Sequence, residues 1–256
     1  MDNGTIVHVD YELYNAENGD LLETTLESIA KEQEMHQEGR TYTPLTTVVG
    51  AGQLIEGFEE SLMEAKVGKE YDIVIEPTKA YGDKDTSLIE TINQDKLMRA
   101  VQDPKSLYIG ASVEIGGRNG TLTLAAAGRY RVDFNHPLAG RSLRYKYTIV
   151  KVIEDRAEKI AALLKSNTGH DDFEVEFEGD DVSITVPQAM LFDTNAAMMK
   201  FRVVSVLRDA TDVAKVSFVE VHEPRVAAAE EETIAEPTFL APVEYPVQVP
   251  LVTRPE

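Results

Sequence analysis

The sequence predicts an α+β fold in which antiparallel sheet dominates and the helices are short. Apolar and polar residues alternate with a period of two, as in strands with one buried face, over 5–14, 71–75, 143–152, 173–177 and 182–186. Apolar residues recur at helical spacing only in short stretches, at 54–65, 157–165 and 195–207. Turn residues such as Asn18-Gly19 and Gly179-Asp180 join neighbouring strands closely, which favours antiparallel pairing.

Composition and charge limit the functions that the chain can have. Of its 256 residues, 45 are Asp or Glu and 25 are Lys or Arg, which gives a formal net charge of −20. A polyanion neither neutralises phosphates nor adheres to anionic lipid, so we expect no nucleic-acid partner and no membrane association. Cys is absent, which excludes disulfides and thiolate chemistry. The N-terminus does not resemble a signal peptide and no run of ~18 apolar residues occurs, so we expect a cytoplasmic protein.

In the first part of the chain, further strands are expected at 21–25 and 46–49. A short amphipathic helix is expected at 54–65, because Leu54, Phe58 and Leu62 recur at helical spacing. Residues 26–40 are rich in charged side chains and fit either a short helix or a loop excursion. The alternating strand at 71–75 ends at Pro77, after which Ala80-Tyr81-Gly82 opens a loop.

Residues 84–129 differ in sequence pattern from the residues that precede them. The stretch 87–100 is weakly helical and is interrupted by Asp103-Pro104. Residues 111–115 and 121–124 flank the glycine-rich segment 116–120, which predicts a β-hairpin. Strands are expected again at 130–134 and 143–152.

A break near Glu154 separates a C-terminal unit. Its helices at 157–165 and 195–207, its hairpin, and a strand at 215–221 suggest a βαββαβ-type α+β unit. The last segment, 226–256, contains five of the eleven prolines and is rich in Glu, so we expect an extended tail that docks on a surface or a partner.

Familiar catalytic and metal-binding signatures are missing. The five His residues are scattered without metal-ligand spacing, so we predict no metal and no cofactor. Gly50-Ala51-Gly52 lacks the strand–helix context of a dinucleotide site, and carboxylates are too abundant to single out a catalytic pair. Any chemistry must therefore depend on apolar and aromatic side chains and on backbone amides.

An ordered set of motifs resembles the FKBP-type peptidyl-prolyl isomerases. The pattern G-x-G-x-x-I-x-G-x-E-x-x-L spans residues 50–62, and Ala80-Tyr81-Gly82 follows it. The segment 133–140, Asp-Phe-Asn-His-Pro-Leu-Ala-Gly, is similar to the SlyD-like branch, in which a small chaperone domain is inserted in the flap of the isomerase. The resemblance implies an FKBP-type antiparallel sheet wrapped on a short helix.

The resemblance also implies a division of the chain. We expect an isomerase domain at 1–84 and 130–153, interrupted by an inserted chaperone domain at 85–129. Residues 154–225 match the long archaeal members by position and size only, and are a candidate dimerisation or scaffold unit. Residues 226–256 form the Pro/Glu-rich tail.

The family's pocket, carried over position by position, falls on Tyr11, Leu22, Glu23, Leu45, Leu54, Ile55, Phe58, Tyr81 and Tyr145. Leu22 stands where the family usually has Phe, Glu23 where it has Asp, and Phe58 where the best-known members have Trp. Taken singly, an aromatic residue on a strand or helix is more often core than pocket. Glu23 fits a pocket wall and a solvated strand end equally well.

The resemblance implies a cofactor-free isomerase with chaperone activity, whose partners are X-Pro peptides and unfolded or partly folded proteins. The apolar residues of the insert either form its own core or remain partly exposed to hold clients. A second hypothesis is a holdase or proline-peptide binding module with little turnover. Homodimerisation through the C-terminal unit is a further expectation.

Overall fold

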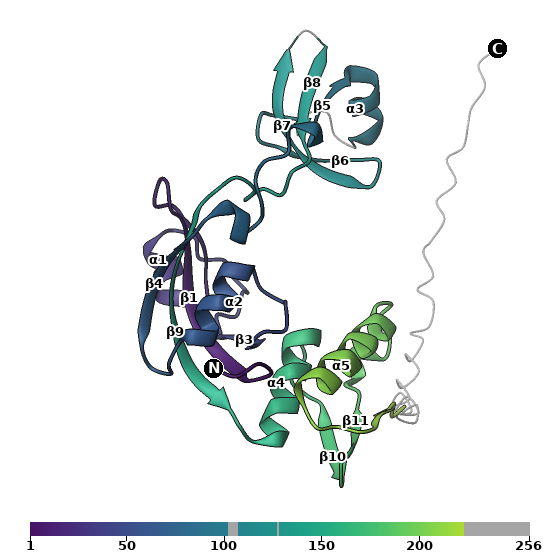
Figure 1. Cartoon of the computed structure of the whole chain (residues 1–256). Helices are drawn as coiled ribbons and strands as arrows, with labels where there is room; N and C mark the ends of the chain where they lie inside the picture. Colours follow the sequence, from purple (N-terminus) through teal and green to yellow (C-terminus); the bar gives the residue numbers. More distant parts are fainter. Residues whose placement is uncertain (102–106, 127, 223–256) are drawn as a thin grey trace, which may run out of the picture. The chain divides into compact units, whose positions relative to one another are not determined.

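The first sheet combines strands from both sides of a long central segment. The computed structural model describes residues 1–101, 107–126 and 128–222. The strands of this sheet pair antiparallel in the order β2 (Leu21–Thr24), β1 (Ile6–Asn15), β9 (Leu143–Ile153) and β4 (Glu70–Ile75), with β3 (Leu45–Val48) also on β1 (Figure 1). The predicted α+β class is confirmed, and residues 26–40 contain the short helix α1 (Glu27–Glu32).

Helix α2 (Glu56–Glu64) covers one face of this sheet (Figure 1). Phe58 and Leu62 lie one turn apart, so both point to the sheet and are buried. Alternation along β1 and β9 directs every second residue to the same side. The resulting first core consists of Val7, Val9, Leu13, Val49, Phe58, Leu62, Ala65, Ile75, Leu143, Tyr145, Tyr147 and Ile149.

The central segment forms a second sheet with its own core. Its antiparallel strands run in the order β5 (Ile89–Asn93), β8 (Arg129–Asp133), β7 (Arg118–Ala126) and β6 (Ser112–Ile115), and α3 (Gln94–Ala100) packs on them. The expected hairpin is present with a tighter turn, because Gly116 and Gly117 both adopt positive φ, as a two-residue type I′ turn requires. The insert core consists of Ile92, Leu97, Val113, Ile115, Leu122 and Val132.

Two expectations for this segment are wrong. Residues 89–93 form a strand and not part of a helix, since they pair with β8. Helix α3 starts only after Asn93. The Asn93 side chain caps this helix by accepting a hydrogen bond from the Lys96 N–H at 2.9 Å. Strand β8 pairs with β5 and β7, so the insert extends past the expected limit of 129 through Asp133. The short helix η1 (Pro77–Lys79) lies in the chain leading into it, and η2 (Thr86–Leu88) lies at its start. We use "the insert" below for residues 85–134.

The C-terminal unit holds α4 (Arg156–Thr168), β10 (Glu174–Glu178), β11 (Asp181–Thr185), η4 (Gln188–Met190), α5 (Ala196–Ala210) and β12 (Val216–Val219). β10 and β11 form the expected hairpin, while β12 pairs parallel with β11. The expected βαββαβ order is wrong, because no separate opening strand is present in the described unit. The end of β9, which precedes α4, pairs with β1 in the first sheet.

A third core joins the C-terminal unit to the first sheet. Ile6, Val48 and Ile153 of the first sheet are buried together with Ile160 and Leu164 of α4 and with residues of β11 and α5. These three side chains lie on the sheet face opposite the first core. All three cores belong to one compact unit, Met1–Val221.

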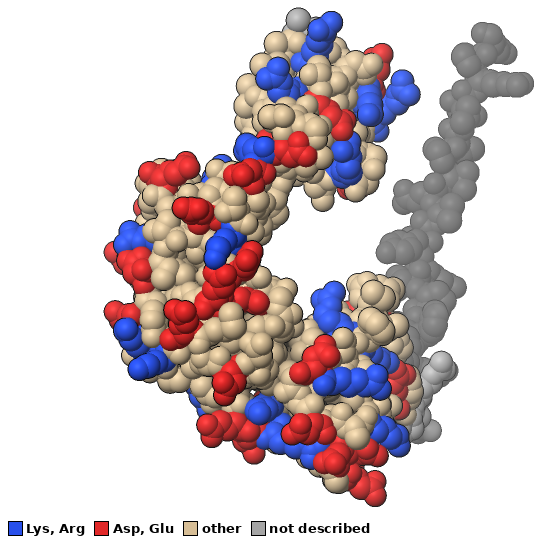
Figure 2. Space-filling model, viewed as in Figure 1, with Lys and Arg blue, Asp and Glu red and all other residues tan. Residues whose placement is uncertain are grey.

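Charge is distributed unevenly along the chain. On the face seen in Figure 2, basic side chains are prominent on the insert, whereas acidic ones are prominent on the first sheet. Residues 85–134 contain six acidic and six basic residues, within a chain whose net charge is −20. Among the described residues no helix is long and apolar enough to cross a membrane. The expected tail at 226–256 lies outside the described residues.

Candidate active site

Three aromatic rings from three elements meet on the α2 side of the first sheet. Phe58 of α2 stacks on Tyr145 of β9 with ring centroids 4.3 Å apart and planes 17° apart. The Tyr11 ring of β1 lies 5.8 Å from the Tyr145 ring and 6.4 Å from the Phe58 ring. Phe58 is only 2% exposed. The three rings therefore form a rigid, apolar aromatic floor.

The close approach of α2 to the sheet depends on a glycine. A Cβ atom on Gly57 would lie 2.6 Å from Cγ2 of Ile75 on β4, which is too close for any side chain other than hydrogen. Gly57 therefore allows the helix to approach the strand and press Phe58 onto Tyr145. The Gly57-Phe58 pair of the sequence motif thus has a direct packing explanation.

The rim of the floor is apolar and is held by one carboxylate. Leu22, Leu54 and Ile55 are partly buried against the first core. The Glu59 carboxylate accepts backbone N–H bonds from residues 52, 53 and 54, at 3.2, 2.9 and 3.3 Å. Sequence reasoning did not assign a role to Glu59, although it is the Glu of the motif. It fixes the loop that leads into Ile55.

Ile55 is the N-cap residue of α2 and has extended backbone angles. Its carbonyl accepts the N–H groups of Phe58 and Glu59, while its own N–H has no hydrogen-bond partner among the described residues. Such an N–H beside an apolar floor can donate to a carbonyl group of a bound peptide.

A polar wall borders Tyr11. Burial raises the pKa of the Tyr11 hydroxyl, and the nearby Glu23 carboxylate raises it further. Arg40 donates from Nη2 to Oε1 of Glu23 over 3.3 Å. Glu23 is thus both an exposed strand residue and a neighbour of the pocket tyrosine. No sequence motif could have identified Arg40, which lies in the loop before β3.

Tyr81 forms the opposite border together with a residue far away in the sequence. Its ring is stacked on that of His136, with centroids 3.9 Å apart and planes 5° apart. The two loops are also joined by their backbones, because Gly140 N–H donates to the Gly82 carbonyl over 2.8 Å. Burial raises the pKa of Tyr145, and the proximity of Tyr81 and Glu23 raises it further, so Tyr81 and Glu23 lie near the same ring.

Leu45 is the predicted site residue that lies apart from this group. It pairs with Val9 across β3 and β1 and is half-buried, but it is not part of the packing around Phe58. The other eight predicted residues contact the first core or line its borders. Within the described ranges no group of three or more His, Asp or Glu side chains could hold a metal ion.

Comparison with known proteins is consistent with this geometry. Residues 1–98 match the family described as FKBP-type peptidyl-prolyl cis-trans isomerase, and residues 156–223 match the family described as FKBP26_C-terminal. The chain is 34% identical over 145 residues to a short-type peptidyl-prolyl cis-trans isomerase of Methanocaldococcus jannaschii, covering 57% of this chain and 89% of that protein.

Bacterial proteins named SlyD are more distant relatives. The chain is 26% identical over 154 residues to SlyD of Helicobacter pylori, covering 60% of this chain and 76% of the relative. It is 28% identical over 124 residues to SlyD of Escherichia coli, covering 48% and 63%. Both relatives are described as FKBP-type peptidyl-prolyl cis-trans isomerases.

Proposed function

Because the chain belongs to the FKBP-type peptidyl-prolyl cis-trans isomerases and is an enzyme of that class, we propose that it rotates X-Pro bonds over the aromatic floor and holds unfolded clients with its insert. The observation that carries the catalytic part is the stacked pair Phe58–Tyr145, buried in the first core with Tyr11 beside it. The nine site residues given above are the proposed substrate pocket, with Leu45 at its periphery.

The reaction needs no covalent step. Rotation about X-Pro is opposed by amide resonance, with a barrier of ~18–20 kcal/mol. The twisted transition state has lost this resonance and much of the amide dipole, so an apolar floor disfavours it less than the planar ground state. A ten-thousand-fold acceleration requires about 5.5 kcal/mol, which apolar contacts and one or two directed hydrogen bonds can supply.

Each part of the pocket has a proposed task. The floor of Phe58 and Tyr145 receives the prolyl ring, and the unpaired Ile55 N–H donates to a substrate carbonyl. The Tyr81 hydroxyl is a second donor at the border. Arg40 holds Glu23, which in turn orients the Tyr11 hydroxyl at the wall of the pocket.

Catalysis is tested by isomerisation of a short X-Pro peptide. A Phe58→Ala/Tyr81→Phe variant, checked for folding by circular dichroism, is expected to lose most of the activity, while the matched variant Tyr108→Phe in the insert retains it. Phe58→Leu keeps an apolar side chain without the ring and is expected to lose about tenfold. Equal rates for wild type and both Phe58 variants would support the holdase hypothesis instead.

The chaperone part rests on apolar side chains that the insert leaves in solvent. Tyr108 is 68% exposed and Ile109 is 66% exposed. The next residue, Gly110, donates its N–H to the Leu122 carbonyl over 2.7 Å, so the backbone of this segment adjoins β7, which carries the exposed Leu124. An exposed apolar patch of this kind can hold apolar segments of an unfolded chain. The neutral charge of the insert removes electrostatic repulsion of acidic clients.

Aggregation suppression is the test of the insert. Ile109→Ser is expected to weaken suppression of client aggregation severalfold without changing short-peptide isomerisation. Val74→Ser is the matched control, since Val74 is 63% exposed on the first sheet. If both variants suppress aggregation as the wild type does, the insert does not hold clients through this patch.

A homodimer is a separate proposal, which rests on α5. Phe201 is 74% exposed, and Met198 lies one turn before it on the same face and is exposed too. We propose that a second copy covers this face. Light scattering of the full chain is expected to give a dimer mass that Phe201→Glu reduces to a monomer mass. A monomeric wild type would exclude the proposal.

A further inference from the structure

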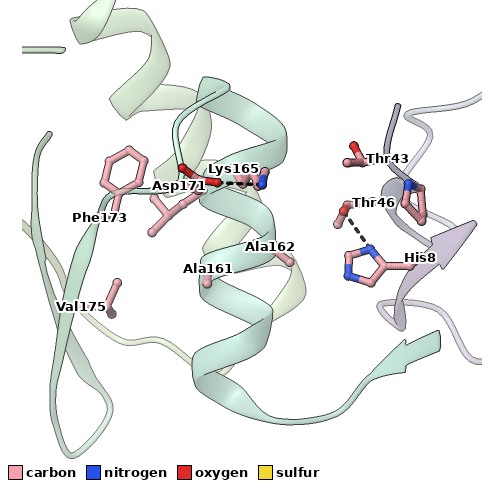
Figure 3. A pocket seen from close by; sticks show the side chains of 11 residues that line it. His8, Thr43, Thr46, Ala161, Ala162, Lys165, Asp171, Phe173 and Val175 are labelled. Atoms are coloured by element: carbon pink, nitrogen blue, oxygen red, sulfur yellow. Dashed lines mark hydrogen bonds and ion pairs between the residues drawn. The ribbon is translucent and has the colours of Figure 1, made fainter. Parts of the chain in front are cut away.

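A second cavity lies on the other face of β1, away from the aromatic floor. Its volume is about 370 Å³, and it is partly open to solvent and bordered by β1, the segment 43–46, α4 and the chain entering β10 (Figure 3). His8 points into it from β1, three residues before Tyr11 and on the opposite face of the strand. Volume and position at the junction of two structural units are typical of small-molecule sites.

Most of the wall is apolar. Ala161, Ala162 and Leu164 of α4 line it together with Phe173 and Val175 at the start of the C-terminal hairpin. Phe173 and Val175 lie on one side of α4, and His8 and Thr46 lie on the other (Figure 3). Two successive alanines on α4 leave the space open, because any larger side chain at Ala161 or Ala162 would occupy part of it. The sequence gives no motif for this site; the alanines are simply good helix formers.

The uncharged polar groups of the lining gather at one end. Thr46 Oγ1 and His8 Nδ1 are hydrogen-bonded over 3.0 Å, and Thr43 lies nearby. Burial lowers the pKa of His8, and the positive charge of Lys151 lowers it further, while Glu158 and Asp10 oppose this effect. The lowered pKa favours the neutral form of the His8 imidazole. One of its nitrogens is engaged with Thr46, and the other is left for a ligand.

The charged groups at the cavity neutralise each other. Lys165 donates from Nζ to Oδ2 of Asp171 over 2.8 Å, one turn along α4 from the alanines (Figure 3). A charged ligand would therefore find no unpaired counter-charge in this pair, and the part of its hydration that it lost would not be compensated. An uncharged ligand with an apolar body has no such penalty.

We propose that this cavity binds an uncharged, mainly apolar small molecule that carries one hydrogen-bonding group, with its body against Ala161, Ala162 and Phe173 and its polar group at the His8–Thr46 end. Binding would occur independently of catalysis, since the cavity shares no residue with the aromatic floor.

Indole is a suitable probe, because it is neutral, apolar and has a single N–H donor. The chain has no Trp, so indole fluorescence that is excited on the long-wavelength side of Tyr absorption can be followed with little background from the protein. Fluorescence titration of the full chain is expected to give saturable binding with a dissociation constant on the order of a millimolar. Labelled alanine methyl groups should show NMR shifts at Ala161 and Ala162, but not at Ala65 or Ala80 beside the aromatic floor.

Two substitutions on the same helix make the test specific. Ala161→Leu fills the cavity and is expected to weaken indole binding at least tenfold. Ala157→Leu is the matched control, one turn earlier on α4 and outside the cavity, and should change binding less than twofold. Thr46→Val retains the side-chain volume but removes the hydroxyl, and should weaken binding about three- to tenfold.

Unchanged indole affinity in Ala161→Leu would overturn the proposal. Methyl shifts confined to Ala65 and Ala80 would overturn it as well, because they would assign the binding to the aromatic floor. No saturation up to the solubility limit of indole would have the same consequence.

Discussion

The first core and the insert core differ in size and in the kind of residue they bury. The first core has twelve buried residues, three of them aromatic, and its rings stack in fixed geometry. The insert core has six, all aliphatic, and leaves Tyr108 and Ile109 in solvent. A pocket that must be complementary to one transition state needs rigid support. A surface that holds many different clients needs apolar area and little rigidity.

The largest expected effect tests the rigidity of the first core. Phe58→Ala should lower the free energy of unfolding by about 3–5 kcal/mol, because the loss of a fully buried ring leaves a cavity beside Tyr145. Urea denaturation monitored by near-ultraviolet circular dichroism would measure it. A loss below about 1 kcal/mol would mean that the first core collapses readily and is as adaptable as the insert core.

A pair of glycines allows the same substitution in both cores. A Cβ on Gly57 would meet Ile75 at 2.6 Å, and a Cβ on Gly120 of β7 would meet Val132 at 2.6 Å. Each Gly→Ala change should cost about 1–3 kcal/mol through overpacking. Hydrogen exchange should show lost protection around α2 in the first variant and only within the insert in the second. Protection lost in both regions by either variant would contradict separate cores.

Alkaline pH should act on the first core through its buried tyrosines. Burial raises the pKa of Tyr145 above the ordinary value of 10.0, and it raises the pKa of Tyr11 as well. Above pH 10, the unfolded state therefore releases protons that the folded state retains. Their contribution to stability is complete below pH 10 and decreases as the pH rises further. The slope of unfolding free energy against pH should be smaller in Tyr145→Phe than in the wild type. Equal slopes would show that Tyr145 titrates normally.

The smallest expected effect concerns the exposed side chains of the insert. Tyr108→Ser should change the free energy of unfolding by less than about 0.5 kcal/mol, since the side chain is mostly in solvent. Urea denaturation gives the value, and a loss above about 1 kcal/mol would mean that Tyr108 belongs to the insert core. Together with Phe58→Ala, this variant defines the two extremes of the comparison.

The sequence by itself determined the local elements and the ordered motif. Period-two alternation depends only on one face of a strand being buried, so 5–14 and 143–152 could be assigned without their partners. The motif at 50–62 likewise brought Ile55 and Phe58 into the candidate site, because Ile55 is the N-cap of α2 and Phe58 lies in its first turn.

Only the tertiary structure decided what depends on distant partners. Alternation in β8 does not say which sheet it joins, and β5 became a strand because β8 lies beside it. The ion pair of Glu23 with Arg40 and the stack of Tyr81 on His136 connect segments that no local pattern links. The cavity between β1 and α4 arises where two units pack with alanines between them. In each case the deciding contact depends on long-range packing, whereas patterns in a sequence report only which side of an element is buried.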